Sequence, residues 1–114
     1  MVCLKLNSKI AIYVHTTIHV NQPADTSKYV SLVQTKLGSW FGGTTTQEAF
    51  GGYISSENEH IGELVYIVRS YCTTTQLEEH FLDVVALGDW LCQELDQESI
   101  TGELNDTMFL MDGS

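Results

Sequence analysis

The sequence IGELVYIVRSY, residues 61–71, contains the most apolar run of the chain, from Leu64 to Val68. Its β-branched and aromatic residues favour a strand. A nearly continuous apolar run is typical of a strand that is covered on both faces. We therefore expect residues 61–71 to lie centrally in a sheet, with the rest of the fold arranged around them.

A helix is expected to follow this strand directly. The sequence Thr75-Gln76-Leu77-Glu78 matches a capping box, in which the threonine hydroxyl accepts a backbone hydrogen bond and the glutamate reaches back. Apolar residues then recur at helical spacing and predict one buried stripe: Leu77, Phe81, Val84, Val85, Gly88, Leu91, Cys92 and Leu95. A last strand is expected over residues 100–111, with a bulge at Gly102.

The N-terminal half predicts a first strand and a first helix. Residues 9–16 alternate in side-chain direction, and β-branched residues continue to Val20, so we expect a strand here. The strand is expected to end at Asn21-Gln22-Pro23, because proline cannot donate a hydrogen bond in a sheet. Asp25 or Thr26 is expected to cap the helix. Its apolar face and its expected end are given by five residues: Tyr29, Val30, Val33, Leu37 and the terminating Gly38.

The predicted order is completed by a strand over residues 44–54, with a break at Gly51-Gly52. Strand, helix, strand, strand, helix, strand is the ferredoxin-like βαββαβ order. It predicts an α+β fold with a four-stranded antiparallel sheet and two helices on one face. With 114 residues, the chain is too short for two cores, so we expect one domain over residues 1–114.

The charge is strongly acidic and uneven. The chain has five Lys and Arg residues and fifteen Asp and Glu residues, which gives a net charge of −10. Arg69 is the last basic residue along the chain. Such a surface repels nucleic acid and anionic lipid, so we expect no direct binding to nucleic acid and no membrane association. No apolar run approaches the ~20 residues of a membrane span. Three cysteines without a CxxC pair suit a reducing compartment, and we expect a cytoplasmic protein.

Catalytic and metal-binding motifs are absent from the sequence. There is no GxSxG and no SxxK. His15-Thr16-Thr17 resembles the HxT element of two-histidine phosphoesterases, but the second copy that those enzymes require is missing. His15 and His19 lie in strand-like sequence, where four residues span about 13 Å, too far for one zinc ion. We therefore predict no catalytic residue, no metal and no cofactor.

The second helix carries another apolar line opposite its buried stripe. Leu82, Ala86 and Trp90 recur at four-residue spacing and are flanked by acids. An exposed tryptophan ringed by acids is a candidate hot spot. The predicted partner-binding residues are Glu79, Leu82, Asp83, Ala86, Trp90 and Glu94. The alternative is that Trp90 covers the edge of the core.

These features favour a non-enzymatic, acidic inhibitor that docks on a basic, nucleic-acid-binding protein. In size and charge the chain resembles phage-encoded anti-defence proteins, including anti-CRISPR inhibitors that mimic nucleic acid.

Two alternatives rest on the free face of the sheet. An open face is typical of a dimer or a ligand floor, so self-association into a homo-oligomer, most simply a dimer, is expected. One alternative is an oligomeric small-ligand or nucleotide-binding module. Its candidate residues are Tyr13, His15, Gly42, Gly43 and Thr44. The other is a small dimeric α+β-barrel enzyme that uses His15 and Tyr13.

Overall fold

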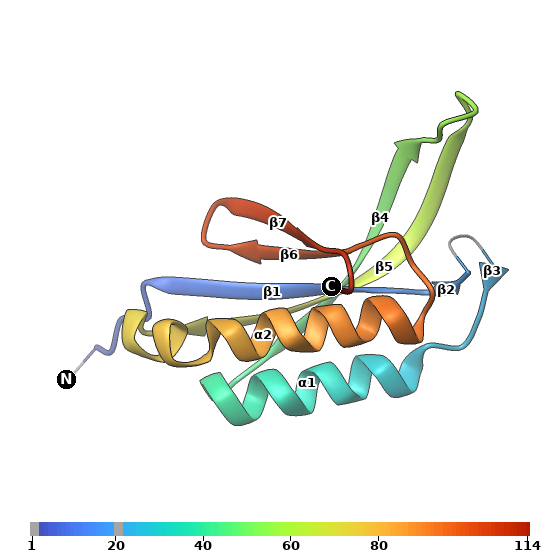
Figure 1. Ribbon diagram of the computed structural model, residues 1–114. Coiled ribbons are helices and arrows are strands. Elements are labelled where there is room, and N and C mark those ends of the chain that lie inside the picture. Colours follow the sequence, from blue (N-terminus) through green and yellow to red (C-terminus); the bar gives the residue numbers. More distant parts are fainter. Residues whose placement is uncertain (1–2, 20–21) are drawn as a thin grey trace.

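The computed structural model describes residues 3–19 and 22–114 as a five-stranded antiparallel sheet, a short hairpin and two helices. Both helices cover the same face of the sheet (Figure 1). The sheet has the order β4-β5-β1-β6-β7. The elements are β1 (Ser8–His15), β2 (Thr17–Ile18), β3 (Gln22–Pro23), α1 (Ser27–Phe41), β4 (Thr45–Ile54), β5 (His60–Cys72), α2 (Thr74–Glu94), β6 (Ile100–Leu104) and β7 (Thr107–Met111).

The α+β class is confirmed, but the four-stranded sheet is wrong, because the expected last strand folds back on itself. Asn105 takes a left-handed backbone conformation, with φ of 53°, and turns β6 into β7. Its amide donates to the carbonyl of Lys9, and its side-chain oxygen accepts from the amide of Lys9. The turn is thereby fixed to the start of β1. Gly102 forms no bulge but pairs in register with Phe109, whose ring fills the space beside it.

The first strand and the first helix have different ends from those expected. β1 ends at His15, and Val20 lies outside the described residues. α1 runs past Gly38 to Phe41, because Phe41 is buried in the core, and the turn comes at Gly42, with φ of 104°. The hydroxyl of Thr26 does not cap the helix, since it donates to the carbonyl of His15.

The second helix begins with a capping box, but two residues before the expected one. Thr73 accepts from the amide of Gln76, and the Gln76 side chain accepts from the amide of Thr73. The box sits there because β5 continues through Cys72, so Thr73 is the first residue to leave the sheet. The predicted stripe packs on the sheet, with Phe81 and Val85 partly buried and Leu87 as an additional buried member.

The main core lies between the helices and β1. Ile10, Ile12 and Val14 project from β1 toward Val33 and Leu37 of α1, and all five are completely buried. β1, rather than β5, is the middle strand of the sheet. β5 is nevertheless covered on both faces, since Val68 joins this core while Val65 and Ile67 are buried on the opposite face.

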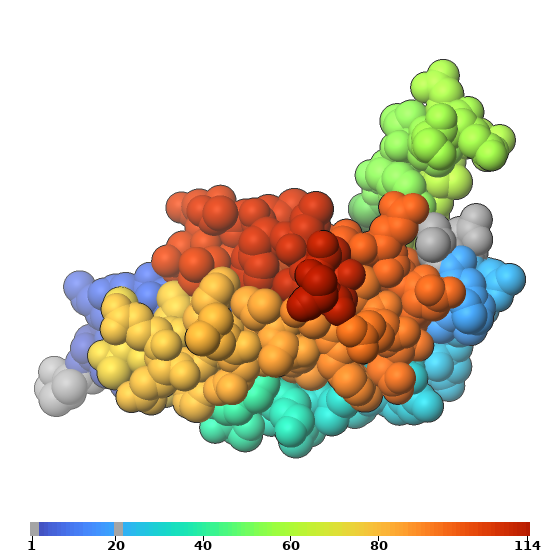
Figure 2. Space-filling view, in the orientation of Figure 1, coloured from blue at the N-terminus to red at the C-terminus, as the bar shows by residue number. Residues whose placement is uncertain are grey.

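β4 and β5 extend beyond the helices as an arm, here residues 49–65, which rises away from the body (Figures 1 and 2). The molecule is correspondingly long, at 55 × 23 × 22 Å. Gly51 and Gly52 do not break β4, because they pair with Glu63 and Gly62. Neither helix in the described part of the chain is long and apolar enough to cross a bilayer.

Candidate active site

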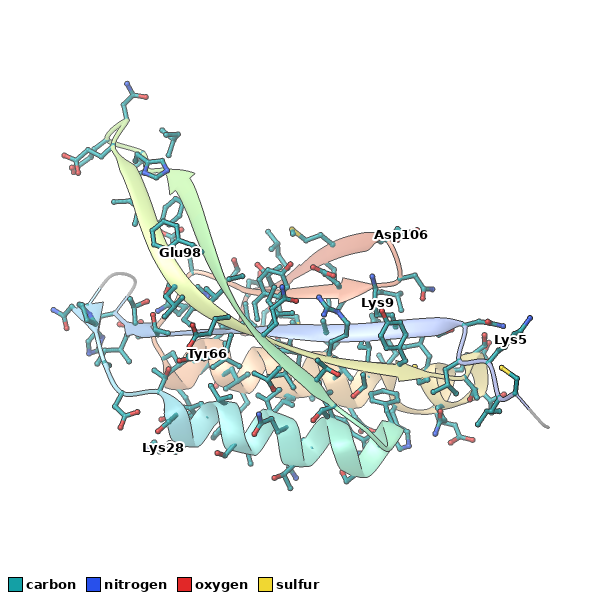
Figure 3. All side chains as sticks on the ribbon, turned by 180° about the vertical axis from the view of Figure 1, so that it is seen from behind. Lys5, Lys9, Lys28, Tyr66, Glu98 and Asp106 are labelled. Carbon is teal, nitrogen blue, oxygen red and sulfur yellow. The ribbon has the colours of Figure 1, made fainter. Side chains whose placement is uncertain are left out.

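A cavity of about 600 Å³ opens on the face of the sheet that carries no helix. It lies in the angle between the arm and the β6–β7 hairpin, where the surface is hollowed (Figure 2). Its size is that of pockets that hold small organic ligands. The α2–β6 loop also lines it, and Glu98 of this loop lies at the base of the arm (Figure 3).

Strand alternation places the polar side chains of the cavity. Residues directly opposite in an antiparallel pair point to the same face. Tyr13 pairs with Ile67 and His15 pairs with Val65, so both aromatic rings point away from the helices. Glu63 lies two residues from Val65 on that same face, and its partner on β4 is Gly51, which has no side chain to cover it.

Glu63 is the central group of the cavity. Its side chain is 11% exposed, and both carboxylate oxygens lie 2.9 Å from Nδ1 of His15. The hydroxyl of Thr17 donates to Oε2 at 2.5 Å. Burial by itself raises the pKa of Glu63, but the hydrogen bonds and charge of His15 and the hydrogen bonds from Thr17 and the Thr16 backbone outweigh it, so the pKa lies below its ordinary value. Glu63 is therefore an anion at neutral pH.

His15 is oriented by this carboxylate. A carboxylate only accepts hydrogen bonds, so Nδ1 of His15 carries a proton and donates to Glu63, and Nε2 is the remaining ring nitrogen. Among the described residues, no group hydrogen-bonds to Nε2 of His15. The ring thus offers its second nitrogen for a hydrogen bond with a molecule in the cavity.

Tyr13 serves as a neutral hydrogen-bonding group. Its hydroxyl donates to Oε1 of Glu103. Burial, together with the hydrogen bond and the charge of Glu103, raises the pKa of Tyr13 to about 12, against a smaller lowering by Arg69. The phenol stays protonated at neutral pH, so it is not a base in this site.

The cavity favours cations. Glu63 and Glu98 line it, and the described lining residues include no lysine or arginine. Opposite charges attract most strongly where water is partly excluded, as it is around Glu63. A positively charged small molecule therefore fits the electrostatics better than a phosphate.

The residues predicted from the sequence fall into three places. Tyr13 and His15 come together in the cavity. Gly42, Gly43 and Thr44 lie outside it, because Gly42 caps α1 by donating to the carbonyl of Gly38. The six predicted partner-binding residues are all exposed on α2, on the helix-covered side of the molecule. Trp90 is 41% exposed and packs against Tyr29, with ring centroids 6.0 Å apart. A partner-binding role for the six residues stays a prediction.

Glu63, Thr17 and Gln97 were not among the predicted site residues. The signal for Glu63 was its place as the one acid inside the most apolar strand, since buried acids are rare without a partner. Nothing in the sequence links Thr17 to Glu63 or Gln97 to Thr17, because the first pair is 46 positions apart and the second is 80 positions apart.

Two solved structures of a phage SAM lyase resemble this chain over nearly its full length. The structure in complex with S-methyl-5′-thioadenosine has a TM-score of 0.72 and 17% sequence identity, and covers 98% of this chain and 95% of that chain. The apo structure has a TM-score of 0.69 and 14% identity, and covers 98% and 96%. The chain shares the fold of these lyase structures. No protein-family model and no curated protein matches the sequence.

This likeness corrects the expected function. A full-length match to an enzyme contradicts the expectation of a non-enzymatic acidic inhibitor that docks on a basic protein. That expectation followed the acids of α2, which lie on the side of the molecule away from the cavity. The solved lyase structures are of phage origin, which is the class of protein that the composition resembles.

The lowered pKa of Glu63 predicts an acid-sensitive fold. A carboxylate whose pKa is lower in the folded state than in the unfolded state stabilises the folded state at pH values above the unfolded pKa, for which the reference value is 4.5. This stabilisation is lost as the pH falls through the folded pKa. We expect the free energy of unfolding, from urea denaturation, to fall less between neutral pH and about pH 3 in Glu63→Gln than in the wild type. Glu98→Gln, at an exposed acid of the same cavity, is the control. An unchanged slope in Glu63→Gln would contradict the assignment of an ionised Glu63.

Proposed function

We propose that the chain is a lyase that cleaves S-adenosylmethionine between the sulfonium sulfur and the γ-carbon, releasing S-methyl-5′-thioadenosine. The observation that carries this proposal is the partly buried, ionised Glu63 in a cavity whose described lining residues include no lysine or arginine. S-Adenosylmethionine carries positive charges on its sulfur and its amino group, and so matches such a cavity. The fold shared with the thioadenosine-bound lyase supports the same class of ligand.

The bond that breaks leaves its electron pair on sulfur, which becomes a neutral thioether. The γ-carbon needs a new electron pair, for which the substrate has two sources. Its own carboxylate can attack the γ-carbon to form a lactone, and no proton is transferred. Alternatively, a base removes a proton from the β-carbon, and the C–H electrons form an alkene. Both routes give S-methyl-5′-thioadenosine and differ in the four-carbon product.

The lining favours the intramolecular attack. Among the described lining residues, no lysine or arginine is available to pair with the substrate carboxylate, which therefore keeps its nucleophilic electron pair. Glu63 is assigned to the amino group, because this positive charge persists through the transition state. A carboxylate against the sulfur would instead stabilise the substrate more than the transition state, which slows the reaction.

Product release also follows from the charges. S-Methyl-5′-thioadenosine is neutral, so it loses the attraction to Glu63 and Glu98 that holds the cationic substrate. Nε2 of His15 and the hydroxyl of Tyr13 remain as hydrogen-bonding groups for the nucleoside part.

Purified protein incubated with S-adenosylmethionine is expected to form S-methyl-5′-thioadenosine and homoserine lactone, detected by liquid chromatography with mass spectrometry. In Glu63→Gln, loss of the charged contact is expected to lower kcat/KM roughly 100-fold. Leu82→Ala, on the opposite side of the molecule, is the control and should keep full activity. A folded wild type that forms no S-methyl-5′-thioadenosine would rule the proposal out, and an alkene product would rule out the intramolecular route.

The homo-oligomer expected from the open sheet face is retained as part of this proposal. Phe50 of the arm lines the cavity and is 77% exposed. Met108, at the other side of the cavity, is 60% exposed. Apolar surface on both sides of the mouth fits contact with a second copy.

Light scattering coupled to size-exclusion chromatography is expected to give a multiple of the 12.7 kDa chain mass for the wild type. Phe50→Glu places a charge in the contact and should shift the mass toward a single chain. Leu82→Glu, which adds the same charge on α2, should keep the oligomer. A wild type that elutes as a monomer at every concentration tested would refute self-association.

A further inference from the structure

A chain of hydrogen bonds joins Glu63 to the α2–β6 loop through Thr17. Nε2 of Gln97 donates to the carbonyl oxygen of Thr17 at 3.0 Å and to its hydroxyl oxygen at 3.2 Å. The hydroxyl of Thr17 in turn donates to Oε2 of Glu63. Because an amide nitrogen only donates and a hydroxyl has one proton, the direction is fixed from Gln97 through Thr17 to Glu63.

Gln97 is itself held firmly by the end of α2. Its amide donates to the carbonyl of Cys92 at 3.0 Å, and the thiol of Cys92 donates to the carbonyl of Gln97 at 3.0 Å. The carboxylate of the preceding residue, Asp96, lies 2.8 Å from Nδ1 of His19, the residue that follows β2. The loop is therefore locked to the segment after β1 from two neighbouring residues.

We propose that Gln97 is a positioning residue, which acts through Thr17 to orient the Glu63 carboxylate toward the ligand. This inference rests on the proposed lyase function. Since Gln97 donates into the hydroxyl oxygen of Thr17, the hydroxyl proton cannot turn toward Gln97 and points to Glu63 instead. His15 holds the same carboxylate from β1, so two donors on separate segments fix its plane.

The geometry separates this role from direct substrate contact. The hydrogen bonds that the side-chain nitrogen of Gln97 makes to the described residues both go to Thr17, although Gln97 also lines the cavity. A residue that bound the ligand with its amide nitrogen would have to give up these bonds. The amide therefore acts on Glu63 rather than on the substrate.

The test uses Gln97→Met and Thr17→Val, which remove the donors at nearly constant size, and Thr17→Ser, which keeps the hydroxyl. The pKa of Glu63 is measured by carboxyl ¹³C NMR titration of the full chain, and kcat/KM is measured against pH. Thr17→Val is expected to raise the pKa by about one unit, since a hydrogen bond to a charged group is worth about 1.5–3 kcal/mol. The kcat/KM of Thr17→Val should fall about tenfold. The acid limb of its plot of kcat/KM against pH should shift to higher pH by the same amount as the pKa of Glu63.

Gln97→Met should shift both quantities in the same direction by a smaller amount, and Thr17→Ser should restore both. Gln93→Met is the matched control, because it removes a glutamine amide bonded to a backbone carbonyl, that of Gly113, away from the cavity. It should change neither quantity. If Thr17→Val fails to fold, Gln97→Met, at a partly exposed position, carries the test.

Two results would overturn the inference. One is an unchanged Glu63 pKa in both Gln97→Met and Thr17→Val. The other is lost activity in Gln97→Met with the pKa unchanged, which would mean that Gln97 contacts the substrate. A raised pKa in a protein whose wild type forms no S-methyl-5′-thioadenosine would support the hydrogen-bond chain and refute the lyase function, so the two failures are distinguishable.

Discussion

His15 and Thr17 donate hydrogen bonds to the carboxylate of Glu63, and these bonds keep it ionised although it is partly buried on the sheet. Burying a charge without partners costs several kcal/mol, so the site requires both donors. The fold supplies them because β1 runs beside β5 and places His15 opposite Val65, two residues from Glu63. The antiparallel register of these two strands is thus the constraint on which the cavity depends.

One face of the sheet packs in the core, and the other face carries the cavity. The helices pack on one face and form the core with Ile10, Ile12 and Val14. This leaves the other face for polar chemistry, bounded by the arm and the β6–β7 hairpin (Figures 1 and 2). The acids of α2, which are five of the fifteen acids in the chain, lie on the helix-covered side of the molecule. A negative net charge therefore keeps the surface hydrated, whereas the acids that line the cavity, Glu63 and Glu98, favour a cationic ligand.

Much of the fold could be predicted from local patterns, because alternation, helical stripes and caps depend on neighbouring residues. The β6–β7 hairpin was missed because its turn at Asn105 is stabilised by Lys9, nearly a hundred residues away. The site was predictable only in part: Tyr13 and His15 follow from strand alternation. Glu63 has a local signal as the one acid of the most apolar strand, but its links to Thr17 and Gln97 depend on sheet register and loop packing, which no local pattern encodes. Gly42 and Gly43 suggested a ligand loop, but Gly42 caps α1 and neither glycine lines the cavity.

The most direct test of the central claim is an NMR titration of the uniformly ¹⁵N-labelled protein with S-methyl-5′-thioadenosine, followed through backbone amide shifts. We expect saturable shifts that are largest at His15, Gly51, Glu63 and the Gln97–Ser99 loop, with α2 around Leu82 unaffected. Shifts that cluster on the outer surface of α2, or no saturable shifts at all, would contradict a nucleoside site on the open face of the sheet.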